Sequence, residues 1–183
     1  MQLTATKIED LMVADSTAIV DHRGAFLRCF CLPALQEALA DRQILQINHS
    51  RTETAGALRG LHFQRPPFAE MKLVRCIRGR VWDVALDLRR GSATFLHWHA
   101  EELSPTNNRM MIIPEGFAHG FQVLEPASEL LYLHTAIYHA ASEGGVRFDD
   151  PRAEIDWPLP VVDLSRRDQN HPFLPANFEG LAA

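Results

Sequence analysis

Nine histidines in a chain of 183 residues are the side chains best suited to chemistry. His97 and His99 lie two residues apart, so a β-strand would place both imidazoles on one face. Together with Glu101, Glu102 and His119 they have the composition of a divalent-metal site, because imidazole and carboxylate groups are common metal ligands. The alternative interpretation, which we favour, is a pair of surface histidines that bind no metal.

Acid–base chemistry is the second possibility for the histidines. A neutral imidazole near pH 7 is suited to proton abstraction, and His62 and His119 lie in the segments RGLHFQ and PEGFAHGF. A strand predicted over 129–138 places Tyr132, His134 and Tyr138 on one face and mostly aliphatic residues on the other. That aromatic and polar face lines the ligand-holding interior of a small barrel, or it meets solvent or a partner.

Short β-strands must position these residues, because the hydrophobic pattern has a period of two along most of the chain. Strands are predicted at 72–77, 81–88, 110–113, 117–124 and 129–138, with turns containing glycine or proline between them. One helix is predicted after Pro33, over 34–40, where Leu35, Ala38 and Leu39 form a stripe. We therefore predict a single all-β domain over residues 1–183, an antiparallel sandwich or barrel.

Composition argues against several classes of protein. A net charge of −5 argues against nucleic-acid binding, and 46% hydrophobic residues argue against disorder. No apolar run approaches the ~18–20 residues that cross a membrane, and no apolar signal segment begins the chain, so we expect a cytoplasmic protein without membrane contact. Cys29, Cys31 and Cys76 are expected to be free thiols, the first two in a strand.

Several segments occur in order along the chain: RGLHFQ at 59–64, KLVRC at 72–76, GRVWDVALD at 79–87, IPEGFAHG at 113–120, Tyr132 with Thr135, and EGGVRFDDP at 143–151. Together they resemble the dTDP-4-dehydrorhamnose 3,5-epimerase family. The resemblance covers about residues 8–170 and leaves 171–183 as a C-terminal tail. It implies a cupin-type jelly roll, catalysis with no metal or other cofactor, and a homodimer that exchanges strands.

The resemblance also implies an activity, the inversion of C3 and C5 in a dTDP-4-dehydro-6-deoxyhexose, as in dTDP-L-rhamnose biosynthesis. Protons on those carbons are acidic because each carbon adjoins the C4 ketone, so inversion passes through an enolate. By this resemblance His62 is the base and Asp168 orients and stabilises its imidazole, while Tyr132 donates a proton from the opposite face.

Substrate contacts follow from the same resemblance. Lys72 and His119 match positions beside the sugar and its developing oxyanion, and Asp83 matches a carboxylate in the same cavity. Arg23 and Arg59 match arginines that hold the pyrophosphate, a role that suits the forked guanidinium group. The other expected contacts are Gln46, Asn48 and Tyr138.

Departures from the family pattern lie at the nucleotide end. His22 and Arg28 occupy positions that are commonly acidic, and Ile19 one that is commonly aromatic, so a different nucleotide is an alternative. Two further alternatives are a monoepimerase that inverts only C3 or only C5 and a metal-dependent cupin enzyme. A non-catalytic sugar-binding cupin is disfavoured because all three proposed catalytic residues are present.

Overall fold

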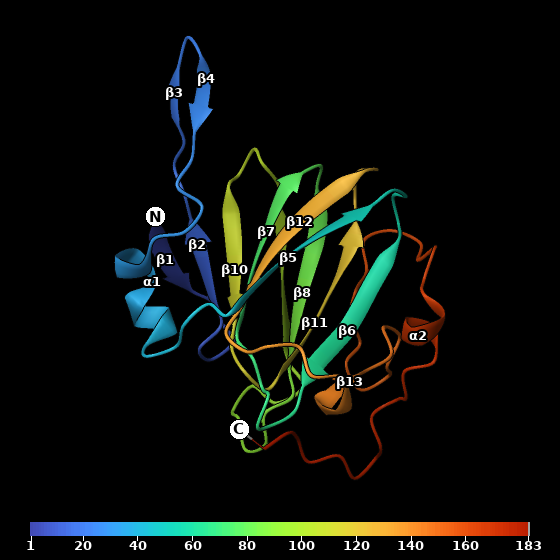
Figure 1. Cartoon of the computed structure of the whole chain (residues 1–183). Helices are drawn as coiled ribbons and strands as arrows, with labels where there is room; N and C mark the ends of the chain where they lie inside the picture. Colours follow the sequence, from blue (N-terminus) through green and yellow to red (C-terminus); the bar gives the residue numbers. More distant parts are fainter. Residues whose placement is uncertain (183) are drawn as a thin grey trace.

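The computed structural model describes residues 1–182 and folds them into two antiparallel β-sheets that face each other (Figure 1). The six-stranded sheet runs in the order β1 (Gln2–Ala5), β2 (Met12–Asp15), β10 (Arg109–Ile113), β7 (Lys72–Arg78), β12 (Ser128–His134) and β5 (Gln46–Thr52). The five-stranded sheet runs β13 (Glu143–Gly145), β6 (Leu58–Gln64), β11 (Phe117–Val123), β8 (Val81–Asp87) and β9 (Trp98–Leu103). This arrangement is a jelly roll, and the all-β prediction is confirmed.

The remaining elements are short. Strands β3 (Ile19–Asp21) and β4 (Gly24–Phe26) form a separate hairpin. The helices are α1 (Leu32–Leu39), η1 (Ala140–Ser142) and α2 (Arg166–Gln169). No helix within residues 1–182 is long and apolar enough to cross a membrane. Ala183, the end of the predicted C-terminal tail, lies outside the described residues.

Three clusters of buried hydrophobic side chains hold the layers together. The central cluster lies between the sheets and includes Val74 and Leu130 from one sheet and Ala85 and Phe121 from the other. A second cluster joins α1 to the outer face of the six-stranded sheet. A third lies on the outer face of the five-stranded sheet, under the C-terminal segment. The sheets therefore have covered outer faces and a shared interior.

Helix α1 forms where the sequence predicts it and begins two residues earlier. Pro33 occupies the first turn, where its missing N–H is tolerated. Leu35 and Leu39, one helical turn apart, are both fully buried against the six-stranded sheet. The predicted stripe is thus the packing face of the helix, although Ala38 is only partly buried.

Two strand predictions need correction. The strand predicted to reach Tyr138 ends at His134, because the chain turns at Thr135, whose hydroxyl accepts a hydrogen bond from the Met71 N–H at 2.8 Å. Cys29 and Cys31 do not lie in a strand: they precede α1, and Cys31 is its N-cap residue. The alternation within β12 is confirmed, since Leu130 points into the central cluster and Leu133 into the cluster under α1.

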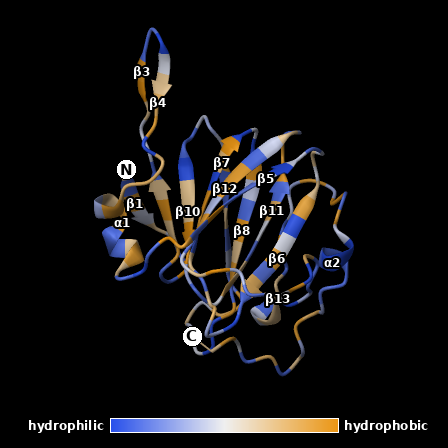
Figure 2. Ribbon diagram, in the orientation of Figure 1, coloured by the Kyte–Doolittle hydropathy of each residue, from blue (hydrophilic) through white to orange (hydrophobic). Residues whose placement is uncertain are grey.

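The β3–β4 hairpin extends away from the two sheets (Figure 1). Its apolar side chains are exposed, with Ile19 71%, Val20 72% and Phe26 67% accessible to solvent. Figure 2 shows β3 in the orange of hydrophobic residues although it contacts neither sheet. A hairpin of this kind has its apolar surface uncovered in a single copy of the chain.

Candidate active site

A cavity of about 550 Å³ opens between the sheets, with walls from β5, β6, β7, β11 and β12. Most of the predicted site residues line it: Asn48, Arg59, His62, Lys72, His119, Tyr132 and Tyr138. Residues far apart in the chain meet here because the jelly roll places the inward-facing positions of both sheets around one space. The cavity is the candidate active site.

His62 and Asp168 form a hydrogen-bonded pair at one wall. His62 Nε2 lies 2.7 Å from Asp168 Oδ1, although the residues are 106 positions apart in sequence. Asp168 lies in the first turn of α2. Ser165 caps this helix, because its Oγ accepts a hydrogen bond from the backbone N–H of Asp168 at 3.0 Å. The Gly60 N–H donates to the other carboxylate oxygen, Oδ2, at 3.4 Å.

These contacts set the charge of Asp168. Burial raises the pKa of the carboxyl, but the hydrogen bond from His62, the His62 charge and the Gly60 N–H together lower it further, so the pKa lies below its usual range. The carboxylate is therefore ionised near neutral pH. An ionised carboxylate at this distance orients the imidazole and stabilises its protonated form.

Two glycines allow the strand that carries His62 to approach its neighbour. Gly60 has φ +127°, and a Cβ there would lie 2.5 Å from the Cα of Gly120 on β11. The close contact places His62 directly opposite His119 in the β6–β11 register, at the point where the ladder is irregular. Both imidazoles consequently line the cavity from the five-stranded sheet.

Tyr132 comes from the opposite wall, on β12 of the six-stranded sheet. Its hydroxyl lies 3.0 Å from Ser50 Oγ on β5, and its ring meets the His119 ring edge-on with centroids 6.2 Å apart. Burial raises the pKa of Tyr132 above its ordinary value, so the phenol keeps its proton at neutral pH. A protonated phenol facing a His–Asp pair across a cavity is a suitable proton donor.

A second histidine–carboxylate pair lies deeper in the cavity. His119 Nε2 is 2.8 Å from Oδ1 of Asp83, which is fully buried, and Asp83 Oδ2 has no hydrogen-bond partner among the described residues. Burial raises the pKa of Asp83, and the neighbouring charges of His119 and Lys72 offset only part of that rise. The predicted contact residue Asp83 therefore contacts His119 and does not line the cavity itself.

Lys72 is held by groups that sequence reasoning missed. Its ammonium lies 3.3 Å from Glu70 Oε1 and 3.4 Å from the carbonyl oxygen of His62. The other oxygen of Glu70 lies 2.8 Å from His134 Nδ1. The sequence could have indicated His134, because it shares the polar face of its predicted strand with Tyr132. No feature of the sequence indicates Glu70.

The outer rim of the cavity carries further charge. Arg59 donates from Nε to Thr52 Oγ1 at 2.9 Å. Arg167, also missed from the sequence, donates to Glu143 Oε1 at 3.1 Å and lies 3.3 Å from His62 Nε2. Tyr138 is half exposed, and its hydroxyl donates to Glu143 at 3.0 Å.

Besides Asp83, two predicted contact residues do not line the cavity. Gln46 lies just outside it and donates from Nε2 to Asn48 Oδ1 at 3.1 Å. Arg23 lies at the tip of the β3–β4 hairpin, where it is largely exposed and pairs with Asp21 at 2.6 Å. Within one chain, therefore, the structure does not bring Arg23 to the other site residues.

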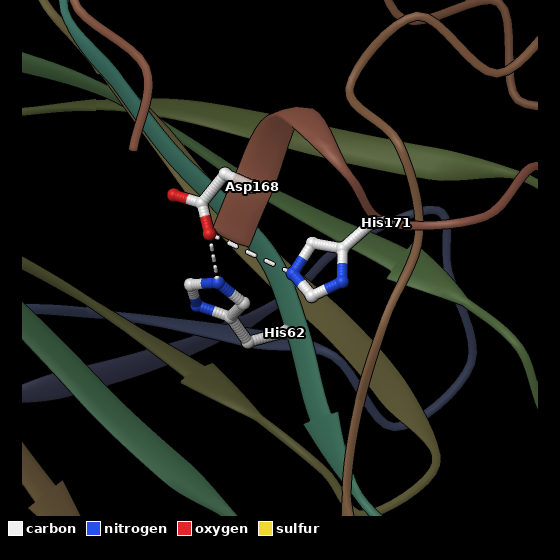
Figure 3. A group of neighbouring side chains, drawn as sticks. All are labelled: His62, Asp168 and His171. Carbon is white, nitrogen blue, oxygen red and sulfur yellow. Dashed lines mark hydrogen bonds and ion pairs between the residues drawn. The ribbon is translucent and has the colours of Figure 1, made fainter. Parts of the chain in front are cut away.

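Within residues 1–182, the only close group of three metal-ligand side chains is His62, Asp168 and His171, whose ligand atoms lie within 4.8 Å of one another (Figure 3). The Arg167 guanidinium lies 3.7 Å from Asp168 Oδ1 and opposes a cation there by charge repulsion. The histidines of the metal alternative form no such group in the described part of the chain, and His99 instead pairs with Glu101 at 3.0 Å.

A protein-family model, described as dTDP-4-dehydrorhamnose 3,5-epimerase, matches residues 5–176. The chain belongs to this family. The match covers both sheets apart from most of β1, together with the β3–β4 hairpin and α2, so it includes every residue of the predicted site. The expected cupin-type fold and the expected family are both confirmed.

Family members from several bacteria are similar over nearly the whole chain. A dTDP-4-dehydrorhamnose 3,5-epimerase from Pseudomonas aeruginosa is 44% identical over 171 residues, covering 92% of this chain and 93% of its own. A crystal structure of dTDP-6-deoxy-D-glucose-3,5-epimerase from Legionella pneumophila, in complex with dTDP-4-keto-L-rhamnose, has a TM-score of 0.89 and 38% identity, covering 94% of this chain and 92% of the other. A dTDP-4-dehydrorhamnose 3-epimerase from Streptomyces niveus is 35% identical, covering 93% of this chain and 82% of its own.

Proposed function

We propose that the chain is an isomerase that inverts C3 and C5 of a dTDP-4-dehydro-6-deoxyhexose, like the 3,5-epimerases it resembles over most of its length. The observation that carries the proposal is a His–Asp pair on one wall of the cavity and a protonated tyrosine on the other. Inversion needs a base on one face of the sugar and an acid on the opposite face. The two walls supply these two groups.

In the proposed reaction His62 accepts the proton from C3 or C5. The electron pair of the broken C–H bond forms a carbon–carbon double bond, and the C4 carbonyl oxygen becomes an enolate oxygen. Asp168, whose low pKa keeps it ionised, stabilises the imidazolium at 2.7 Å. The Tyr132 phenol then returns a proton to the same carbon from the other face, and the enolate collapses to the ketone with that centre inverted.

The enolate oxygen needs positive charge or hydrogen-bond donors nearby. Lys72 and His119 line the cavity and supply both, and they help catalysis because an enolate attracts them more strongly than a neutral ketone does. Glu70 and Asp83 hold these two groups in place at 3.3 and 2.8 Å. Arg59, at the rim, is proposed to bind the pyrophosphate, and Asn48, Gln46 and Tyr138 to bind further parts of the ligand.

The decisive experiment follows the ketosugar substrate, dTDP-4-dehydro-6-deoxyglucose, by proton NMR in deuterated water. Deuterium should enter at both C3 and C5, and His62→Ala should abolish exchange at both carbons. His97→Ala, a change at an exposed histidine outside the cavity, is the matched control and should leave exchange intact. Full exchange in His62→Ala would refute the mechanism, and loss of activity with a chelator would favour the metal alternative.

A monoepimerase is the second candidate, because one relative is named as a 3-epimerase. It would use the same base and acid on one carbon only. The NMR experiment distinguishes the two candidates directly, since a monoepimerase incorporates deuterium at one of the two carbons and not at the other. The same assay with substrates carrying other nucleotides tests the alternative raised by His22, Arg28 and Ile19.

A homodimer is part of the proposal. The β3–β4 hairpin extends from the body with its apolar side chains exposed, and it carries Arg23 away from the chain's own cavity. We infer that the hairpin packs on a second copy and brings Arg23 to the partner's pyrophosphate site. Replacing residues 18–27 by a glycine–serine linker should give a monomer with a raised KM. A full-length chain that sediments as a monomer at micromolar concentration would contradict the inference.

A cytoplasmic location is also proposed. Cys29, Cys31 and Cys76 are free thiols, which supports a reducing compartment. Fractionation of cells that produce the untagged chain tests this proposal, because the protein should be recovered with cytoplasmic and not with membrane or secreted markers.

A further inference from the structure

A third histidine–carboxylate pair lies at the cavity, and its histidine has no role in the reaction proposed above. His134 Nδ1 is 2.8 Å from Glu70 Oε2, and the two side chains are only 10% and 8% exposed. Both residues line the same cavity as the proposed base and acid. Burying polar groups is costly unless hydrogen bonds satisfy them, so the contacts around this pair indicate its function.

The pair is one end of a continuous chain of hydrogen bonds along the cavity wall. His134 Nε2 lies 3.4 Å from Asn48 Nδ2, and Asn48 Oδ1 accepts from Gln46 Nε2 at 3.1 Å. Gln46 Oε1 accepts from the backbone N–H of Tyr138 at 3.0 Å. At the other end, Glu70 also holds the ammonium of Lys72 at 3.3 Å.

The groups at the two ends of this series of hydrogen bonds fix which partner donates in each bond between them. A backbone N–H can only donate, so Tyr138 fixes Gln46 with its oxygen toward the backbone and its NH₂ toward Asn48. Glu70 can only accept when ionised. Burial raises its pKa, but the hydrogen bond from His134 and the charge of Lys72 oppose that rise, and the pKa lies below its ordinary value.

The intermediate groups therefore have defined polarity. His134 carries its proton on Nδ1, where it donates to Glu70, and its Nε2 lone pair accepts from the Asn48 amide. Asn48 uses one amide hydrogen for His134 and its oxygen for Gln46. One N–H on Asn48 and one on Gln46 are then free of these bonds, and Asn48 lines the cavity.

We propose that Glu70 and His134 are positioning residues for substrate recognition: they fix the amides of Asn48 and Gln46 so that N–H donors meet acceptor oxygens of the nucleotide sugar. This inference rests on the proposed function, because it concerns the same cavity and substrate. Neither residue exchanges a proton with the sugar, and Glu70 rather than His134 makes the ion pair with Lys72, so a change at His134 acts on substrate binding more than on the chemical step.

The test compares two substitutions at one position. His134→Gln keeps one donor and one acceptor on a single side chain, as the neutral imidazole does, whereas His134→Leu keeps neither. Loss of one oriented hydrogen bond weakens binding by about tenfold. We expect His134→Leu to raise KM for dTDP-4-dehydro-6-deoxyglucose by about that factor with kcat within about threefold of the wild type, and His134→Gln to restore KM to within about threefold.

Each outcome decides the inference. Equal KM values in both variants, or a loss confined to kcat, would overturn it, because a merely structural role does not depend on the donor and acceptor. If His134→Leu does not fold, as judged by its thermal melt, His134→Met, which has the length of glutamine without its amide, makes the same comparison with His134→Gln. A wild-type chain that exchanges no C3 or C5 proton refutes the proposed function instead, which keeps the two failures distinct.

Discussion

Asp168→Asn is the sharpest test of the proposed base, because it changes charge and hydrogen bonding without changing size. In the native chain His62 Nε2 approaches one oxygen of Asp168 at 2.7 Å and the Gly60 N–H donates to the other at 3.4 Å. A backbone N–H cannot donate to an amide NH₂, so the introduced amide should direct its oxygen to Gly60 and its NH₂ to His62. That orientation holds the imidazole proton on Nδ1, the nitrogen that the mechanism needs as an acceptor.

The size of the effect follows from the geometry. Asp168 is 3% exposed, so its attraction for an imidazolium is weakly screened. Charges about 4 Å apart interact by about 4 kcal/mol at an effective dielectric constant of about 20, and a hydrogen bond to a charged group contributes about 1.5–3 kcal/mol. A loss of about 2–4 kcal/mol in the transition state lowers kcat by about 30- to 1000-fold.

Initial rates of deuterium incorporation at C3 and C5 measure this loss. Asp156→Asn is the matched control, because Asp156 is exposed and lies outside the cavity. Circular dichroism should show both variants folded. A folded Asp168→Asn variant whose exchange rate stays within about threefold of the wild type would refute the assignment of Asp168 as the stabilising partner of His62.

Two further predictions follow from the site. Tyr132→Phe removes the proposed acid and leaves the base, so C–H exchange should persist while net inversion falls by at least about 100-fold, as measured by product NMR; retained inversion would exclude Tyr132 as the donor. Folding lowers the pKa of Asp168, so its stabilisation is present above the unfolded carboxyl pKa of about 4 and is lost as pH falls through the folded value. In urea titrations the stability difference between the wild type and Asp168→Asn should therefore shrink between pH 7 and pH 2, and a constant difference would contradict this linkage.

The sequence predicts five strands of the jelly roll, β7, β8, β10, β11 and β12, because the pattern of burial in them repeats every two residues. β8 shows this directly: its alternate faces contribute Ala85 to the central cluster and Leu86 to the outer one. The pattern predicts less about where a strand ends, since the end of β12 depends on a contact between Thr135 and Met71, 64 residues away. The sequence predicts a strand at Cys29 and Cys31, but these residues lead into α1, and Cys31 is the N-cap residue of that helix.

The site is less predictable than the fold, because its contacts link distant segments. No spacing rule connects His62 to Asp168, which are 106 residues apart, and only the resemblance to a family paired them. Glu70 was missed because a single carboxylate beside Met71 matches no motif. Arg23 is a different case: its hairpin leaves the chain's own cavity, so its predicted contact requires a second copy.

The two histidine–carboxylate pairs of the proposed reaction differ in the direction in which the fold shifts the pKa of the carboxyl group, and this difference supports separate roles for them. Asp168 has a lowered pKa, so its pair holds one proton on His62 Nε2 and leaves Nδ1 free to accept another. Asp83 is fully buried, which raises its pKa, and it holds His119 by a contact of 2.8 Å to Nε2. We infer that the first pair removes the substrate proton and the second donates a hydrogen bond to the enolate oxygen. The same two residue types perform opposite tasks because burial and hydrogen bonding move the two carboxyl pKa values apart.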